Sequence, residues 1–118
     1  MVERTQLSQE GGGVEQLFES SGSFGELLRA LRARRSITQD TLGSHVGIHP
    51  STISRFERGD DIPNIRQTVL LADELWVSRF GMLEASGHIE IDVSDSDLER
   101  SLREVLRKIV DSGFLKIR

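Results

Sequence analysis

The sequence predicts an all-α fold, a bundle of four to five helices followed by a C-terminal amphipathic helix. Two observations support this prediction: apolar residues recur at helical spacing in successive segments, and residues that start or stop helices flank these segments. With 118 residues, 36% hydrophobic and 5% aromatic, the chain fits one small domain with an aliphatic core. We expect a flexible arm over residues 1–22, a helical domain over 23–87 and an extension over 88–118.

The arm is predicted from its composition. It contains Gly- and Ser-rich clusters at residues 11–13 and 20–22 and has too few apolar residues to offset the entropy of ordering. Val14, Leu17 and Phe18 fit a single helical turn, which we interpret as a brief nascent helix.

The helical domain is expected to begin with two short helices. Ser23 and Glu26 have the spacing of a capping box, which predicts the start of the first helix. This helix is expected to end at residues 36–37. Its apolar face is formed by residues at helical spacing: Phe24, Leu27, Leu28 and Leu31. Thr38 is the expected N-cap of the second helix, and Gly47 is its expected end, because glycine adopts the left-handed conformation of a sharp turn.

The third helix is expected to run from His49-Pro50 to Gly59 and to have two unlike faces. At about 100° per residue, Ile53 and Phe56 share one side. Polar and basic residues lie on the opposite side, with Thr52 on the flank: Ser51, Ser54, Arg55 and Arg58. The apolar side therefore packs inward, and the basic side is the outer face.

Two further helices are expected before the extension. Apolar residues indicate a fourth helix from about Asn64: Ile65, Val69, Leu70, Ala72 and Leu75. A shorter fifth helix covers 77–85. Residues 89–93 alternate apolar and polar, as an edge strand or an extended linker would, and we prefer the linker. A capping box at residues 96–99 opens the C-terminal helix, whose apolar stripe comprises Leu98, Leu102, Val105, Leu106 and Ile109.

Composition and motifs exclude several classes of protein. Apolar runs such as residues 69–72 are far shorter than the roughly 20 residues that cross a bilayer. No secretion signal is recognisable at the N-terminus, so we expect a cytoplasmic protein with no membrane partner. The absence of cysteine excludes disulfides, thiolate catalysis and cysteine-ligated zinc.

The sequence also predicts that the protein is not an enzyme and needs no cofactor. It contains no phosphate-binding glycine motif and no nucleophile elbow. The three histidines, His45, His49 and His88, lack the paired spacing and the carboxylate partner of a metal site. We therefore expect no bound metal.

Charge is distributed unevenly along the chain. The formal net charge of −4 argues by itself against a nucleic-acid partner. Between Phe24 and Arg58, however, six arginines stand against three carboxylates. A positively charged segment is therefore embedded in an acidic chain, and it includes the basic face of the third helix.

Two short helices joined by a tight glycine turn, the second with a basic face, meet the requirements of a helix-turn-helix. The motif residues occur in order along the chain: Thr38-Gln39, Gly47, Ile53-Ser54, Glu57, Gly59 and Pro63. Over roughly residues 24–75 the chain resembles the phage-repressor (Cro, lambda-repressor or XRE) helix-turn-helix family. This resemblance implies a lambda-repressor-like bundle in which residues 50–58 enter the major groove of double-stranded DNA.

The resemblance also implies site residues, position by position. Gln39 matches a position that contacts the DNA backbone. The base-facing positions match Pro50, Ser51, Thr52 and Arg55. Arg55 is the main candidate for base recognition, because a guanidinium makes a bidentate contact with O6 and N7 of guanine. Four further residues are candidate phosphate contacts: Ser54, Arg58, Asn64 and Arg66.

Some positions depart from the family pattern. Gly43 stands where the family usually has Ala, and a mid-helix glycine costs about 0.5–1 kcal/mol relative to Ala, so the second helix is expected to be soft. Ser36 replaces the usual turn glycine, and Pro50 has no side-chain hydrogen-bonding group at a base-facing position. Arg32 and Glu57 match an ion pair that ties the first helix to the third, a structural role.

The resemblance implies a sequence-specific transcriptional regulator, such as a repressor. One helix-turn-helix contacts few base pairs, so we expect a homodimer that reads an approximate palindrome, with dimerisation or a protein-partner surface in the extension. Two alternatives stay open. The first is an antitoxin or adaptor that holds a partner protein through the N-terminal arm or the last helix, and the second is an interaction module that no longer reads DNA.

Overall fold

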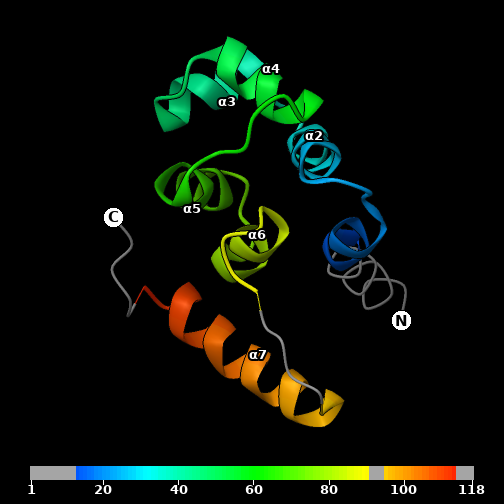
Figure 1. Cartoon of the computed structure of the whole chain (residues 1–118). Coiled ribbons are helices and arrows are strands. Elements are labelled where there is room, and N and C mark those ends of the chain that lie inside the picture. The colour runs from blue at the N-terminus through cyan, green and yellow to red at the C-terminus, as the bar shows by residue number, and fades with distance from the viewer. Residues whose placement is uncertain (1–12, 91–94, 114–118) are drawn as a thin grey trace, which may run out of the picture. The chain divides into compact units, whose positions relative to one another are not determined.

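The structure is a computed structural model that describes residues 13–90 and 95–113. Within these residues the regular secondary structure is entirely helical, which confirms the all-α prediction (Figure 1). No helix in the described ranges combines the length and the apolar character that crossing a membrane requires. The chain divides into two compact units, Met1–Asp61 and Ile62–Arg118, and this division falls inside the range 23–87 that the sequence assigns to one domain.

The first unit contains three helices of the sequence motif: α2 (Phe24–Arg34), α3 (Gln39–Val46) and α4 (Pro50–Arg58). α4 packs against both α2 and α3. The buried side chains are those at the predicted inward positions: Phe24, Leu27, Leu28, Leu31, Leu42, Ile53 and Phe56. Residues 13–20, which lie in the segment expected to be a flexible arm, form a further helix in which Val14, Leu17 and Phe18 are half-buried.

Most of the observed caps of these helices are the ones that the sequence predicts. Thr38 Oγ1 accepts a hydrogen bond from the Thr41 backbone N–H at 3.0 Å, as expected of an N-cap. Gly47 and Gly59 hold left-handed conformations, with φ of 72° and 80°. The expected capping box at Ser23 is only half formed. Ser23 Oγ accepts from the Glu26 N–H, but the Glu26 carboxylate reaches one residue further back and accepts from the Gly22 N–H.

The second unit contains α5 (Ile65–Glu74), α6 (Arg79–Ala85) and α7 (Ser96–Asp111). α5 packs on α6, and α6 packs on α7. Phe80, Leu83 and Val110 form a buried cluster here, against which Val69, Ile89 and Leu106 pack. On α5 the buried residues include Thr68, Leu71 and Ala72, whereas Ile65 and Leu70 of the predicted apolar pattern are exposed.

The C-terminal helix differs from its prediction in two respects. It is capped by Asp95 rather than Ser96: the Asp95 carboxylate accepts from the N–H groups of Asp97 and Leu98, and its negative charge is favourable at a helix N-terminus. The buried edge of α7 passes through Leu106 and Val110, so most of the predicted stripe is exposed. Residues 89 and 90 form no strand, and the rest of the 89–93 segment lies outside the described residues.

Gly43 has a packing role that helix propensity does not show. A Cβ atom at this buried position would lie 2.3 Å from the backbone carbonyl oxygen of Ile48. The absence of a side chain therefore lets the segment after Gly47 pass directly over α3. At the turn before α3, by contrast, Ser36 holds a left-handed conformation with φ of 55° although it is not glycine.

We predict that Gly43→Ala destabilises the protein by about 1–3 kcal/mol, because the methyl group overlaps backbone that cannot move aside cheaply. Helix propensity alone gives the opposite sign, a gain of about 0.5–1 kcal/mol. Urea unfolding of the full chain, followed by circular dichroism, measures the change. Ser44→Ala, on the exposed side of the same helix, is the control and should change stability by less than about 0.5 kcal/mol. A more stable Gly43→Ala variant would contradict the close approach.

Candidate nucleic-acid interface

α4 separates a buried apolar face from an exposed polar one, as its sequence predicts. Ile53 and Phe56 are buried. The side chains of Arg55 and Arg58 are each 55% exposed on the other side. Ser51 is also exposed, while Thr52 and Ser54 are half-buried. The result is a helix whose inward contacts fix its position while its basic side chains reach solvent.

The first turn of α4 is held by a histidine cap. His49 Nδ1 accepts a hydrogen bond from the Ser51 backbone N–H at 3.1 Å and lies 2.7 Å from Ser51 Oγ. Pro50 occupies the first helical position, where its missing N–H has no helical partner. These contacts fix the end of α4 that carries the predicted base-facing residues.

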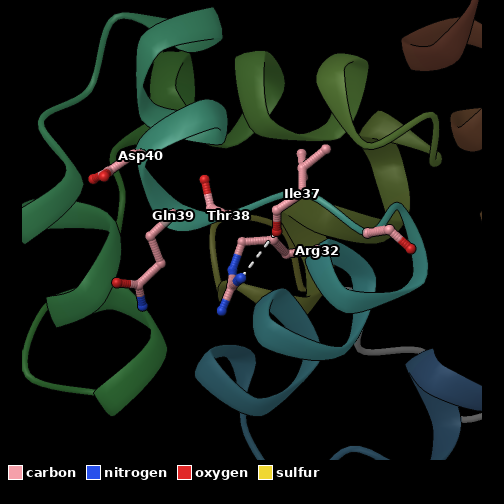
Figure 2. Close-up of a pocket in the computed structure, with 6 residues that line it drawn as sticks. Arg32, Ile37, Thr38, Gln39 and Asp40 are labelled. Carbon is pink, nitrogen blue, oxygen red and sulfur yellow. Dashed lines mark hydrogen bonds between the residues drawn. The ribbon is translucent and has the colours of Figure 1, made fainter.

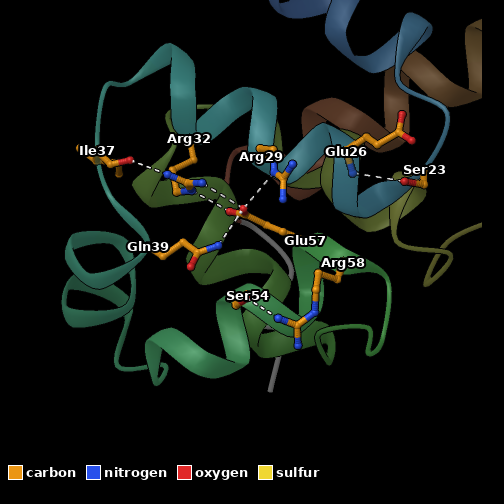
Figure 3. A network of polar contacts seen from close by, with 9 residues as sticks. All are labelled: Ser23, Glu26, Arg29, Arg32, Ile37, Gln39, Ser54, Glu57 and Arg58. Atoms are coloured by element: carbon orange, nitrogen blue, oxygen red, sulfur yellow. Dashed lines mark hydrogen bonds and ion pairs between the residues drawn. The ribbon is translucent and has the colours of Figure 1, made fainter.

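A buried carboxylate joins α2, α3 and α4 (Figure 3). The side chain of Glu57, on α4, is fully buried, and it accepts two hydrogen bonds from Arg32 of α2, at 2.7 Å and 3.0 Å. Gln39, the first residue of α3, donates to the same carboxylate at 3.0 Å. Arg29 of α2 approaches it to 3.5 Å. The predicted Arg32–Glu57 ion pair is therefore confirmed, and it forms part of a larger network.

The network changes how its members titrate. Burial alone would raise the pKa of the Glu57 carboxyl, but hydrogen bonds from Arg32 and Gln39, the Arg32 charge and Arg29 together lower this pKa below its ordinary value. The hydrogen bond to Glu57 raises the pKa of Arg32. Glu57 is therefore a buried anion at neutral pH, neutralised by its arginine neighbours.

Arg32 also fixes the segment between α2 and α3. Its Nη1 donates to the Ile37 carbonyl oxygen at 3.0 Å, a bond visible in Figure 2. Beside it lies an open hollow of about 470 Å³ at the start of α3, lined by Arg32, Ser36, Ile37, Thr38, Gln39 and Asp40. The arginine thus links α4, through Glu57, to the backbone that leads into α3.

Two arginines on the outer face of α4 pair with the acidic loop that follows the helix. Arg58 Nε donates to Asp60 at 3.0 Å, and Arg58 Nη1 donates to Ser54 Oγ at 2.8 Å. Arg55 Nη2 lies 3.8 Å from an Asp61 carboxylate oxygen. All four charged side chains are more than half exposed, and exposed pairs of this kind typically contribute 0–1 kcal/mol. These arginines can therefore exchange a loop carboxylate for another anion at little cost.

A comparison with protein families agrees with this geometry. Residues 23–79 match the model of a family described as a helix-turn-helix domain. The match agrees with the resemblance of this part of the chain to helix-turn-helix proteins of the XRE type. Over 69 residues the chain is 38% identical to the HTH-type transcriptional repressor RghR of Bacillus subtilis (strain 168), a match that covers 58% of this chain and 51% of that protein. The chain thus spans about half the length of this relative. No solved structure gives a significant match.

Most of the predicted site residues lie in the first unit of the chain, on α4 or at the start of α3. Asn64 and Arg66 belong to the second unit. Asn64 is the N-cap of α5: its Oδ1 accepts from the Gln67 N–H at 2.7 Å, and Gln67 Oε1 accepts from the Asn64 N–H at 2.9 Å. Arg66 is exposed on the first turn of α5. The Asn-x-x-Gln spacing of residues 64–67 is the sequence signal of this capping box.

Sequence reasoning missed two contacts of the helix-turn-helix domain. Arg29, one of the six arginines between Phe24 and Arg58, approaches the Glu57 carboxylate. Gln39 was assigned to DNA alone, yet its amide bonds Glu57 within the protein. These residues are separated from Glu57 by 28 and 18 positions, so no local pattern reveals the contacts.

We predict that Glu57→Gln destabilises the protein by about 3 kcal/mol at neutral pH, because it removes the buried anion that Arg32 neutralises. Since folding lowers the pKa of Glu57, its contribution is complete above the unfolded pKa of about 4.3 and is lost as the pH falls through the folded pKa. Urea unfolding at pH 7 and at pH 3 measures the effect. Between these pH values the free energy of unfolding should fall less in the variant than in the original protein.

Asp60→Asn is the matched control for this prediction. It removes an exposed carboxylate of the same unit and should change stability by less than about 1 kcal/mol. Equal effects of the two substitutions would show that the Glu57 network does not hold the unit together.

Proposed function

We propose that this protein is a cytoplasmic transcriptional regulator that binds double-stranded DNA in a sequence-specific manner, with α4 in the major groove. The observation that carries the proposal is the exposure of Arg55 on the outer face of a helix whose opposite face is buried. A helix about 10–12 Å across fits the major groove, where base edges present distinguishable patterns of donors and acceptors. The helix-turn-helix match supports the same assignment.

Base recognition in this proposal centres on Arg55. Its guanidinium leaves the loosely held Asp61 and makes two hydrogen bonds to O6 and N7 of a guanine. Ser51 and Thr52 contribute short donors or acceptors that specify a base less strongly. Pro50 contributes van der Waals contact only, because its side chain has no hydrogen-bonding atom. Direct readout by this helix therefore depends on few residues.

Phosphate contacts fix the helix in the groove. Arg58 and Ser54, already bonded to each other at 2.8 Å, offer a paired donor group to one phosphate. The Gln39 side-chain amide donates one hydrogen to Glu57. We infer that it donates its second hydrogen to a phosphate of the DNA backbone near the start of α3. Asn64 and Arg66 are proposed to contact phosphates from the first turn of α5. These contacts position the protein without reading sequence.

The functional form in this proposal is a homodimer. A single helix-turn-helix reads few base pairs, and two copies related by a two-fold axis read half-sites roughly 34–36 Å apart or a multiple of that distance. Binding weakens steeply with salt, because phosphate contacts release counterions. The net charge of −4 limits attraction to arbitrary DNA, so that affinity depends on the local basic face.

We predict that Arg55→Ala weakens binding to a selected operator by about 1–3 kcal/mol, or roughly fivefold to 150-fold, and relaxes the preference at one base pair. Selection from a random duplex pool provides the operator, and fluorescence anisotropy measures the affinities. Arg100→Ala, which removes the same charge from an exposed position on α7, is the control and should leave affinity unchanged. Equal affinities of the Arg55→Ala variant and the original protein would refute groove insertion by this face.

The loop carboxylate opposite Arg55 gives a second prediction. Asp61→Asn removes the intramolecular competitor for the guanidinium and one negative charge beside the DNA, so it should tighten binding to arbitrary duplexes about threefold to tenfold at low salt. The ratio of operator affinity to arbitrary-sequence affinity should fall. Anisotropy titrations with a selected and a scrambled duplex measure both quantities. Unchanged or weaker binding to the scrambled duplex would contradict the competition.

A further inference from the structure

α7 is fixed on α6 along one edge. Val110 belongs to the buried cluster with Phe80 and Leu83. Asp111, at the end of α7, accepts hydrogen bonds from the Phe80 backbone N–H at 3.0 Å and from Ser78 Oγ at 2.8 Å. Further along, Arg103 pairs with Glu84 of α6 and with Glu99 of its own helix. These contacts occupy the edge of α7 that passes through residues 99, 103, 106 and 110.

The adjacent edge of α7 is apolar and uncovered. Leu98, Leu102 and Val105 are 56%, 40% and 53% exposed, and the half-buried Ile109 continues the row. The spacings of four, three and four residues are those of the seam of a two-helix coiled coil. A row of large exposed aliphatic side chains on an otherwise charged helix marks an interaction surface. We call this row, residues 98, 102, 105 and 109, the α7 seam.

We propose that the α7 seam is the surface through which two copies of the chain associate, with their α7 helices antiparallel. The proposal rests on the dimer of the proposed function and specifies its interface. In the symmetric register, Leu98 lies opposite Ile109 of the second copy, and Leu102 lies opposite Val105 of the second copy. Each apolar side chain of the row then faces another, and the edge held by α6 stays undisturbed.

The charges along α7 select both the partner and the orientation. One flank of the seam carries Asp97 in the first turn and Lys108 in the last turn, whereas Glu99 pairs with Arg103 and Arg107 pairs with Glu104 within the helix. An antiparallel pair sets Asp97 of each helix beside Lys108 of the other, and it also opposes the two helix dipoles favourably. A parallel pair sets Asp97 beside Asp97 and Lys108 beside Lys108. The helix is thus complementary to a reversed copy of itself.

The size of the seam limits its strength. A helix of 16 residues is about 24 Å long, and a pair of such helices buries less area than a standard stable interface. We therefore expect association in the micromolar range for the free protein. Two adjacent half-sites on one DNA molecule raise the effective concentration and complete the dimer there.

The first experiment measures self-association of the full chain by analytical ultracentrifugation from 1 to roughly 300 µM, a range chosen to bracket this affinity. The original protein should show a monomer–dimer equilibrium, and Leu102→Glu with Val105→Glu should weaken it at least tenfold. Arg100→Glu on the far side of the helix changes the net charge by the same two units and is the matched control. Circular dichroism checks that α7 remains helical in each variant. A protein that stays monomeric throughout, or a double variant that still dimerises, overturns the proposal.

The second experiment determines the orientation. The chain contains no cysteine, so single cysteines can be placed without background. Leu98→Cys in one copy and Ile109→Cys in a second copy with a longer tag are mixed and treated with a short bismaleimide. An antiparallel seam gives mainly the mixed 98–109 product, because like positions are about 16 Å apart along the helices. Predominant 98–98 and 109–109 products overturn the antiparallel arrangement.

DNA binding separates this inference from the function on which it rests. The double Glu variant should bind an isolated half-site with unchanged affinity and lose at least tenfold on the complete palindrome. If the original protein dimerises through the seam but enriches no DNA sequence, the interface stands and the proposed function fails. If it binds its operator with no contribution from the seam, the function stands and the interface is overturned.

Discussion

The first unit depends on one buried charge. Glu57 is fully enclosed, and a carboxylate in that position is tolerated only because Arg32, Gln39 and Arg29 surround it with donors and positive charge. Its partners come from α2 and α3, while Glu57 itself belongs to α4. A displacement of any of these helices separates the anion from its donors, so the network fixes their relative positions more sharply than non-directional apolar packing does. Gly25 contributes to the same junction, because a Cβ atom there would lie 2.4 Å from the Glu57 carbonyl oxygen.

The outer face of α4 follows from this arrangement. With Ile53, Phe56 and Glu57 facing inward, the helical period leaves Arg55 and Arg58 facing solvent, where they pair with carboxylates of the adjoining loop. Arg55 and Arg58 therefore form weak, exposed ion pairs rather than buried ones, and these pairs can be replaced by contacts with another anion. In the proposed DNA complex of a chain of net charge −4, such pairing favours a duplex that offers both phosphates and a matching base edge over one that offers charge alone.

In the second unit, two adjacent edges of α7 have different surroundings. One edge of α7 docks on α6 through Leu106 and Val110 and through the Arg103–Glu84 pair. The neighbouring edge carries the α7 seam, which remains exposed. An amphipathic pattern in the sequence combined both edges into one stripe, because residues 105 and 106 are about 100° apart and both fall within a broad apolar face. The proposed groove-binding helix and the proposed pairing helix therefore lie in different units of the chain.

The sequence alone determined the local structure: helical periods, the Thr38 cap, the turn glycines 47 and 59, and the division of α4 into two faces, because each depends on residues a few positions apart. It also identified the Arg32–Glu57 pair, but only through family resemblance. The tertiary structure decided the rest. Packing brought Gln39 and Arg29 to Glu57, made Gly43 indispensable beneath Ile48, and chose which edge of α7 is covered. Contacts of this kind join segments that are distant in sequence, so no local periodic pattern of residues predicts them.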